Sequence, residues 1–168
     1  MQAIRTDIIT RPITAGDRER LADAFERLSP ASRYKRFLHP KHRLTDAELT
    51  YFTELDHRRH EALVAVDPSD GSIVGVARYA ALDTTCCTAD LAFAVVDEWQ
   101  GRGVATTLLR ALLPRAEENG MDQFVALTLQ ENAPARRLLR RFGFRTVSSS
   151  HGISELRLEL RRTLRVAA

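Results

Sequence analysis

The sequence of 168 residues has little cysteine and no long apolar run, and each shortage excludes a class of protein. Its two cysteines are the neighbours Cys86 and Cys87, which cannot build a disulfide framework and which favour a reducing compartment. No stretch approaches the roughly 18 uninterrupted apolar residues that a membrane-spanning helix needs. Residues 1–7 lack the apolar core of a signal peptide and include the acidic Asp7. We therefore expect a cytoplasmic protein.

Lysine is also scarce, because Lys35 and Lys41 are the only two and arginine supplies the rest of the positive charge. The formal net charge of +3 suits an anionic ligand such as a nucleotide cofactor or a nucleic acid, and does not decide between them. An apolar share of 44% and a charged share of 28% are typical of a soluble globular protein. We find no internal repeat or linker, so we expect one domain over 1–168.

The first third of the chain predicts a strand followed by helices. Apolar side chains recur at helical spacing, and Ser, Thr and Pro residues stand where helices begin. Pro12 in the first strand favours an edge position, because proline donates no ladder hydrogen bond. We expect this strand over 8–13 and helices over 17–28, 31–37 and 46–55.

The middle of the chain changes to strand patterns with short connections. The segment 67–71 is dense in turn residues and separates two apolar runs. Connections of this length join antiparallel neighbours. We expect an antiparallel meander over 62–66, 72–82 and 88–96.

The last third alternates helices and strands. A helix over 103–119 should be kinked or divided by Pro114, and a strand over 124–129 should run parallel to the strand before that helix, as a β-α-β unit. A further helix follows Asn132, and a hairpin that turns near 148–152 closes the chain. The fold class is α+β, with a mixed sheet, a central β-α-β unit and flanking helices.

The most informative segment is the loop from Gln100 to Thr106, between an apolar strand and an apolar helix. Gly101 and Gly103 allow backbone N–H groups to approach a ligand, and the helix N-terminus adds partial positive charge, so the loop suits an anion. Arg102 adds a candidate charge contact. A dinucleotide fingerprint would need glycine at Thr106, and the spacing of a P-loop is absent. A plain glycine turn that caps a helix is the structural alternative.

The string Gln100-x-x-Gly103-x-Ala105 resembles the Gln/Arg-x-x-Gly-x-Gly/Ala signature of the GNAT superfamily of N-acyltransferases. The predicted order of elements is similar over nearly the whole chain. The resemblance implies that the loop amides hold the pyrophosphate of acetyl-CoA. It also implies that the preceding strand splays from its parallel neighbour and that the pantetheine arm lies in the gap.

Asn132 followed by Gly143-Phe144 is similar to the later helix of the same superfamily. Asn132 is expected either to cap this helix or to bond the pantetheine amide. Many relatives have a tyrosine in this helix that protonates the departing thiolate, whereas the corresponding residue here is Leu139. The cofactor-binding residues implied by the resemblance are Val95, Val96, Gln100, Gly101, Arg102, Gly103, Val104, Ala105, Thr106 and Asn132.

A narrower resemblance links the segments 28–37, 44–49 and 60–65 to the GNAT domain of bacterial protein-lysine acetyltransferases of the Pat type. Some of those proteins carry an added regulatory or acyl-CoA-synthetase-like domain, for which a chain of this length has no room. The resemblance implies a protein lysine as the acceptor.

The candidate catalytic residue is Asp90. Acyl transfer needs a neutral amine, yet a free lysine is deprotonated only about once in two thousand molecules at pH 7, so a base is useful. Asp90 is the one carboxylate in the apolar strand 89–96, where apolar surroundings raise its pKa. Pat-type domains place the longer glutamate here, which favours transfer through a water. The alternative is a strand-end aspartate that faces solvent or pairs with an arginine.

Other polar residues give weaker signals. The pairs His39/His42 and His57/His60 have metal-like spacing, but no cysteine or carboxylate completes a set, so we predict no metal. Residues near the start of the meander are candidates for lining an acceptor site, and these are Asp56, His57 and Glu61.

We therefore expect an acetyl-CoA-dependent N-acetyltransferase that transfers directly to a protein lysine, with Asp90 as base through water. Two alternatives stay open, which are a small-molecule amine acceptor and a catalytically silent acyl-CoA-binding module. Nucleic-acid binding ranks last because interleaved aromatics and a recognisable motif are missing. We expect no membrane partner and leave a homodimer open.

Overall fold

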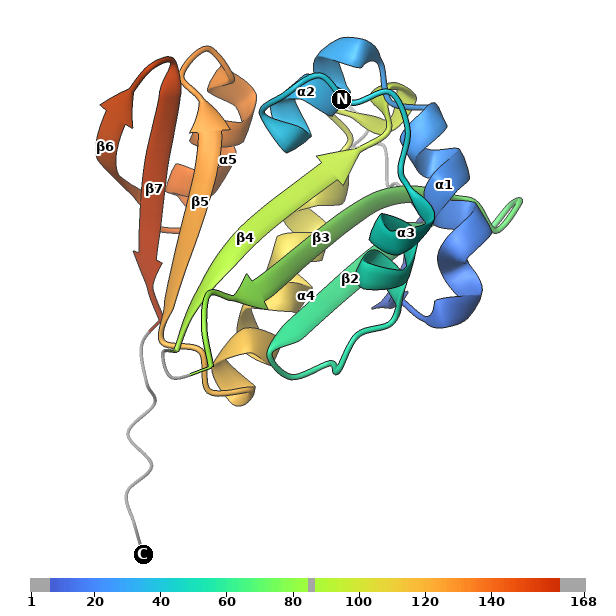
Figure 1. Cartoon of the computed structure of the whole chain (residues 1–168), viewed down its shortest axis with the longest axis horizontal. Helices are drawn as coiled ribbons and strands as arrows, with labels where there is room; N and C mark the ends of the chain where they lie inside the picture. The colour runs from blue at the N-terminus through green and yellow to red at the C-terminus, as the bar shows by residue number, and fades with distance from the viewer. Residues whose placement is uncertain (1–6, 85–86, 161–168) are drawn as a thin grey trace, which may run out of the picture.

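A single seven-stranded sheet runs through the protein in the order β1-β2-β3-β4-β5-β7-β6 (Figure 1). The computed structural model describes residues 7–84 and 87–160, so Cys86 lies outside the described residues. Only the contact of β4 with β5 is parallel, and the other strand pairs are antiparallel. The strands are β1 (Ile9–Pro12), β2 (His60–Val66), β3 (Ile73–Ala81), β4 (Thr88–Val95), β5 (Gln123–Leu129), β6 (Arg145–Ser150) and β7 (Ile153–Glu159).

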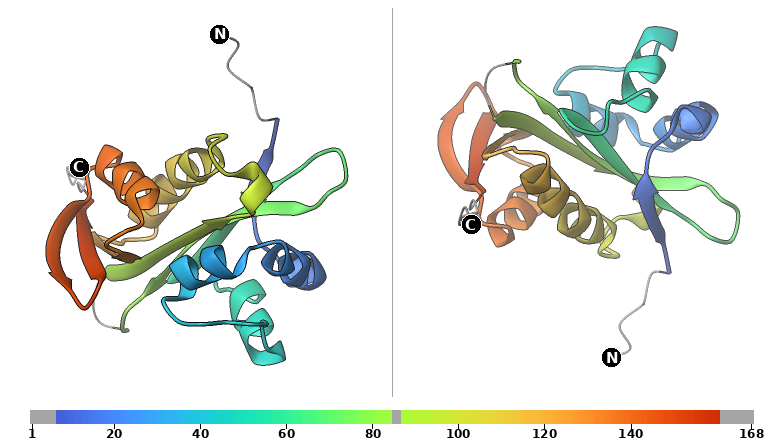
Figure 2. Two further views of the ribbon diagram at one scale, coloured as in Figure 1. Left: turned by 90° about the horizontal axis from the view of Figure 1, so that it is seen from above. Right: turned by 90° about the horizontal axis from the view of Figure 1, so that it is seen from below.

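The helices cover both faces of the sheet (Figure 2). One face carries α1 to α3, and the other carries α4 and α5. Short 3-10 turns precede α1 and α4. The helices are η1 (Ala15–Asp17), α1 (Arg18–Glu26), α2 (Pro30–Phe37), α3 (Asp46–Thr53), η2 (Asp97–Trp99), α4 (Val104–Glu118) and α5 (Ala133–Arg141). Within the described ranges, no helix has the length and apolarity to cross a bilayer.

The expected meander and β-α-β unit are confirmed. β2, β3 and β4 pair as consecutive antiparallel neighbours, and α4 connects β4 to the parallel β5. Pro12 lies on the edge strand β1, where its missing N–H costs no ladder bond. Local signals also fix helix starts, since the Ser29 hydroxyl accepts from the Ser32 amide and Thr45 forms a capping box with Glu48.

The expectation that Pro114 divides its helix is wrong, because α4 runs unbroken from Val104 to Glu118. The proline removes one hydrogen bond of the helix. Fully buried leucines in the two turns before the proline pack on the sheet, and this packing stabilises the helix. Gly120 follows the C-cap residue Asn119, and its φ of 84° suits the glycine that terminates a helix.

Helix α4 packs against β3 at very short range, and Gly75 allows this approach. A Cβ atom at Gly75 would lie 2.8 Å from Val104 Cγ1 and 3.2 Å from Leu108 Cδ1. Val104 and Leu108 are both buried in the close-packed core and have no free space to move into. Gly75 therefore sets the distance between the sheet and the first turn of α4.

We predict that Gly75→Ala lowers the free energy of unfolding by about 1–3 kcal/mol, because overpacking forces α4 away from β3. Urea denaturation monitored by circular dichroism measures the change. Gly16→Ala is the matched control, since a Cβ there meets Thr14 Oγ1 at an ordinary 3.7 Å. A control variant that is destabilised as much as Gly75→Ala would contradict the packing explanation.

Candidate cofactor groove and acceptor site

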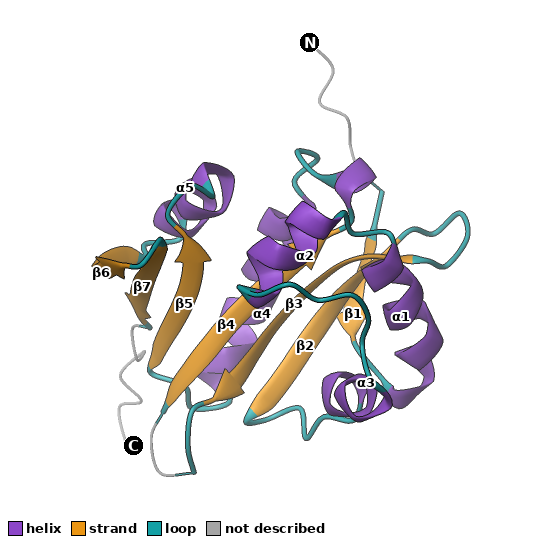
Figure 3. Ribbon diagram, turned by 45° about the horizontal axis from the view of Figure 1, so that its top comes forward, coloured by secondary structure: helices purple, strands orange, loops and turns teal. Residues whose placement is uncertain are grey.

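The site begins where two parallel strands separate. β4 and β5 pair only over Thr88–Asp90 and Gln123–Val125, although β4 continues to Val95 and β5 to Leu129. Figure 3 shows the two strands diverging beyond this point. The divergence opens a groove of about 500 Å³, whose walls come from β4, β5, α5, α2 and the loop before α4. Past the last strand pair, the facing edges of β4 and β5 have no strand partner.

The glycine loop lies at one end of this groove. Gly101 has a φ of 72° and Gly103 a φ of 83°, in the left-handed region that favours glycine. Gly103 caps α4 without any side-chain hydrogen bond to the first turn, so the amide groups of that turn are available to a ligand. The chemistry of this donor set fits a pyrophosphate, which needs N–H donors and positive potential.

Gln100 braces the loop. Its side-chain amide donates to the carbonyl oxygen of Val95 at 3.0 Å and to the Ser32 hydroxyl at 3.2 Å. The side chain thus joins the end of β4 to α2 and fixes the entry of the glycine turn. Gln100 acts on the anion site through the geometry of the backbone.

Most of the residues that the sequence implied for cofactor binding meet at the groove. Two do not line it. Val96 is 2% exposed and its amide donates to the Val74 carbonyl at 3.0 Å, while the guanidinium of Arg102 lies 5.2 Å from the centre of the Trp99 ring. The implied residues that line the groove are Val95, Gln100, Gly101, Gly103, Val104, Ala105, Thr106 and Asn132.

The α5 wall combines a structural cap with an apolar surface. Asn132 Oδ1 accepts from the Ala135 amide at 3.4 Å, and the residue also lines the groove. Leu139 is 1% exposed and lines the groove where many relatives have a tyrosine. This wall therefore offers no phenolic proton to a leaving group.

Sequence reasoning expected the gap beside β5 but named no residue of β5, and it missed the contribution of α2. The groove is also lined by Ser32, Lys35 and Arg36 from α2 and by the buried Thr128 from β5. The helix itself was expected, but its position over β4 depends on long-range packing. The regular helical spacing of these polar residues was the one available signal, and it is equally typical of a solvated helix face.

Asp90 occupies the last paired position before the strands separate, opposite Val125 on β5 and Ala80 on β3. Its side chain is exposed to solvent and does not line the groove, whose β4 lining begins at the next residue, Leu91. Partial burial raises the pKa of Asp90, while the nearby Arg36 and Arg78 pull it down. The carboxylate is therefore accessible to solvent and lies beside the opening between the strands.

Side chains from α2, α3 and β3 surround Asp90. Arg78 is 7% exposed and stacks on the rings of Tyr51 and Phe52. His60 is hydrogen-bonded to Arg78. Burial, together with the charge of Arg78, lowers the pKa of His60 to about 4, so the imidazole is neutral at pH 7. The sequence did not indicate this cluster, because its members come from separate elements.

The other polar candidates have structural roles. Asp56 Oδ1 accepts the backbone amides of residues 58, 59 and 60 and shapes the turn into β2. Glu61 is fully buried, where it pairs with Arg115 of α4 at 2.9 Å and with His57 at 2.8 Å. It faces α4, on the opposite side of the sheet from His60. In the described part of the chain no cluster of three or more metal-ligating side chains occurs.

A mixed sheet that opens between two parallel strands, with a glycine loop and a helix N-terminus at the mouth, defines an acyl-CoA-dependent transferase. The sequence profile of the acetyltransferase (GNAT) family matches residues 21–144. The protein belongs to this family. It is an acyl-CoA-dependent acetyltransferase, and acetyl-CoA is its co-substrate.

Three comparisons agree with this assignment. Acetyltransferase PA5475 of Pseudomonas aeruginosa is 34% identical over 142 residues, which are 82% of this chain and 74% of that protein. The GNAT domain of S. lividans PAT is 31% identical, with a TM-score of 0.84 over 91% of this chain and 90% of that one. Acetyltransferase Pat of Mycolicibacterium smegmatis is 31% identical over 85% of this chain, which spans 43% of Pat.

We predict that Gly103→Ala weakens acetyl-CoA binding by about 5–30-fold, because the left-handed conformation costs a residue with a Cβ about 1–2 kcal/mol and the loop amides turn away from the ligand. Isothermal titration measures the dissociation constant. Gly120→Ala is the matched control, since Gly120 has a φ of 84° and the same free space but lies at the other end of α4. Equal loss of affinity in both variants would contradict a role of the loop in binding.

Proposed function

We propose that this protein acetylates the ε-amine of protein lysines by direct transfer from acetyl-CoA, with Asp90 as the general base acting through a water. The observation that carries this proposal is the position of Asp90 at the point where β4 and β5 separate. Asp90 thus lies open to solvent, directly before Leu91, the first β4 residue that lines the cofactor groove. The resemblance to Pat-type proteins supports a protein lysine as acceptor.

The proton of the lysine ammonium passes to a water and from it to the carboxylate of Asp90. Aspartate is one methylene shorter than the glutamate of Pat-type domains, and a water spans the difference. The neutral amine attacks the thioester carbon of bound acetyl-CoA, so that a C–N bond forms. The attacking nitrogen loses its second proton to solvent as the C–S bond breaks, and Asp90 then releases its proton to solvent. Asp90 suits this role because its raised pKa makes the carboxylate a stronger base than free aspartate.

Two negative charges develop during the transfer, one on the carbonyl oxygen and one on the leaving sulfur. From Leu91 onward the edge of β4 that faces β5 has no strand partner, so its amide groups are candidates for stabilising the developing oxyanion. Leu139 provides no proton for the thiolate, which in this proposal leaves as an anion and is protonated by solvent. The basic side chain of Lys35, which also lines the groove, favours that anion.

A small-molecule amine is the second acceptor class, and a silent acyl-CoA-binding module is the third reading. Thiol-release assays with lysine peptides and with a panel of polyamines, amino acids and aminoglycosides separate them. Turnover confined to small amines contradicts the protein-lysine proposal, and binding of acetyl-CoA without any turnover favours the silent module.

We also propose a cytoplasmic location, based on cysteine usage, and a homodimer stays an open alternative.

We predict that Asp90→Asn lowers kcat by about 10²–10⁴-fold, the usual contribution of a general base, and leaves acetyl-CoA affinity unchanged. Asp90→Glu should restore turnover, because glutamate reaches the amine without a water. Asp23→Asn is the matched control, since Asp23 is an exposed aspartate on α1. Wild-type turnover by Asp90→Asn would rule Asp90 out as the base.

The pH profile gives an independent test. The base works only when it is ionised, so kcat/KM rises as the pH passes upward through the pKa of Asp90. Because partial burial raises that pKa, the acid limb should lie above the value of about 3.9 for a free aspartate. The limb should disappear in Asp90→Asn, and a limb that persists there belongs to another group.

A further inference from the structure

Two arginines at the inner end of the groove form no ion pair with a carboxylate, although the charge of the nearby Asp90 acts on both. Arg36 on α2 is half-buried and Arg78 on β3 is buried. Among residues 7–84 and 87–160, at least seven other arginines form ion pairs with Asp or Glu, whereas neither of these two does. A buried guanidinium without a carboxylate is costly and calls for an explanation.

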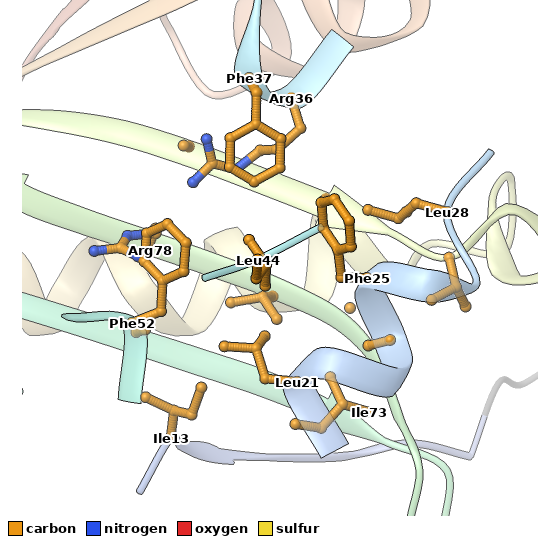
Figure 4. A pocket seen from close by; sticks show the side chains of 17 residues that line it. Ile13, Leu21, Phe25, Leu28, Arg36, Phe37, Leu44, Phe52, Ile73 and Arg78 are labelled. Carbon is orange, nitrogen blue, oxygen red and sulfur yellow. The ribbon is translucent and has the colours of Figure 1, made fainter. Parts of the chain in front are cut away.

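The two guanidiniums are close enough to repel each other. Burial and the charge of Arg78 lower the pKa of Arg36 to about 10, and burial lowers the pKa of Arg78. Figure 4 shows both side chains reaching the same end of an apolar pocket beneath α1, α2 and α3. Arg36 also lines the cofactor groove, which places this pair beside the site of transfer.

Aromatic rings hold the faces of both guanidinium groups. Arg78 lies 4.3 Å above the ring centre of Phe52 and 5.0 Å above that of Tyr51, and Arg36 lies 4.8 Å from that of Phe37. Stacking occupies the flat face of a guanidinium and leaves its edge for hydrogen bonds. Arg78 already bonds His60 and Tyr51 there, so its remaining N–H groups and those of Arg36 are the donors for a planar oxyanion. The aromatic rings therefore orient the two guanidinium groups without neutralising their positive charge.

The charge around Asp90 is therefore unbalanced. Two guanidiniums meet a single carboxylate, His60 is neutral at pH 7, and Glu155 and Arg157 of β7 pair with each other at 2.7 Å. The excess of one positive charge opposes a bare ammonium and favours an acceptor that brings a negative charge with it. Arginine forks match a carboxylate in shape as well as in charge.

We propose that Arg36 and Arg78 bind a carboxylate that the acceptor carries beside its reactive amine. The inference rests on the proposed lysine acetylation and narrows its substrates to lysines with an acidic neighbour. The carboxylate has two sources, which are the side chain of a neighbouring Asp or Glu and the α-carboxylate of a C-terminal or free lysine. Carboxylate recognition is common to both.

Matched peptides test the proposal. Each contains one lysine in a neutral sequence and one Asp or Glu at a neighbouring position, with the Asn or Gln isostere as its pair, and lysine with a free or amidated α-carboxylate forms the second arm. We expect kcat/KM for the best acidic acceptor to exceed that of its amide partner about tenfold, the size of a charge-assisted hydrogen bond. Equal values in both arms would overturn the proposal.

Variants assign the preference to the two arginines. R78Q and R36Q change residues on separate elements. In both variants the ratio of kcat/KM for the acidic peptide to kcat/KM for the amide peptide should fall toward one, and R78K should keep part of the preference for the acidic peptide. R110Q is the matched control, since Arg110 is an exposed arginine on α4, across the sheet, and should keep the full ratio. An unchanged ratio in R78Q, or an equal loss of kcat on both peptides, contradicts carboxylate binding.

A binding measurement separates this inference from the proposed function. Fluorescence anisotropy with labelled peptides in the presence of coenzyme A needs no turnover. Equal affinity for the acidic and amide peptides overturns the arginine proposal alone. Tighter binding of acidic peptides without any acetylation of them supports the arginine site and counts against lysine acetylation.

Discussion

The separation of β4 from β5 is the constraint on which the rest of the structure depends. Three residue pairs join the strands, and beyond them each strand is held only from its other side, β4 by β3 and β5 by β7. Backbone groups on the facing edges therefore need partners other than a strand. Val95 finds one in the Gln100 side chain. The fold thus creates, in the middle of its sheet, the kind of edge that most proteins confine to the periphery.

The two halves of the site differ in what builds them. The cofactor half consists largely of backbone groups and small residues, since Gly101, Gly103 and the start of α4 supply its donors. The proposed acceptor half consists of long side chains, above all Arg36 and Arg78, that come from a helix and a strand distant in sequence. A loop built from backbone tolerates few substitutions, whereas the side chains around Asp90 are free to differ between relatives with different acceptors.

This difference explains how much could be read from the sequence. The meander, the β-α-β unit and the glycine loop follow from local patterns, and the structure has each of them. The unbroken α4 could not be predicted, because the packing that outweighs Pro114 is a tertiary property. The Arg36–Arg78 cluster was invisible for the same reason. The orientation of Glu61 could have been predicted, because side chains alternate between the two faces along β2 and this places Glu61 and His60 on opposite faces.

The contact of α4 with Gly75 has a thermodynamic consequence. The turn that begins α4 is pressed against β3 at Gly75, braced by Gln100 at its entry, and closed by the Thr107 hydroxyl, which donates to the Gly103 carbonyl at 3.2 Å. A loop fixed at three points has little conformational entropy left to lose when a ligand arrives. The contacts that hold the loop form during folding, so most of the ordering cost of the pyrophosphate site is met before any cofactor is present.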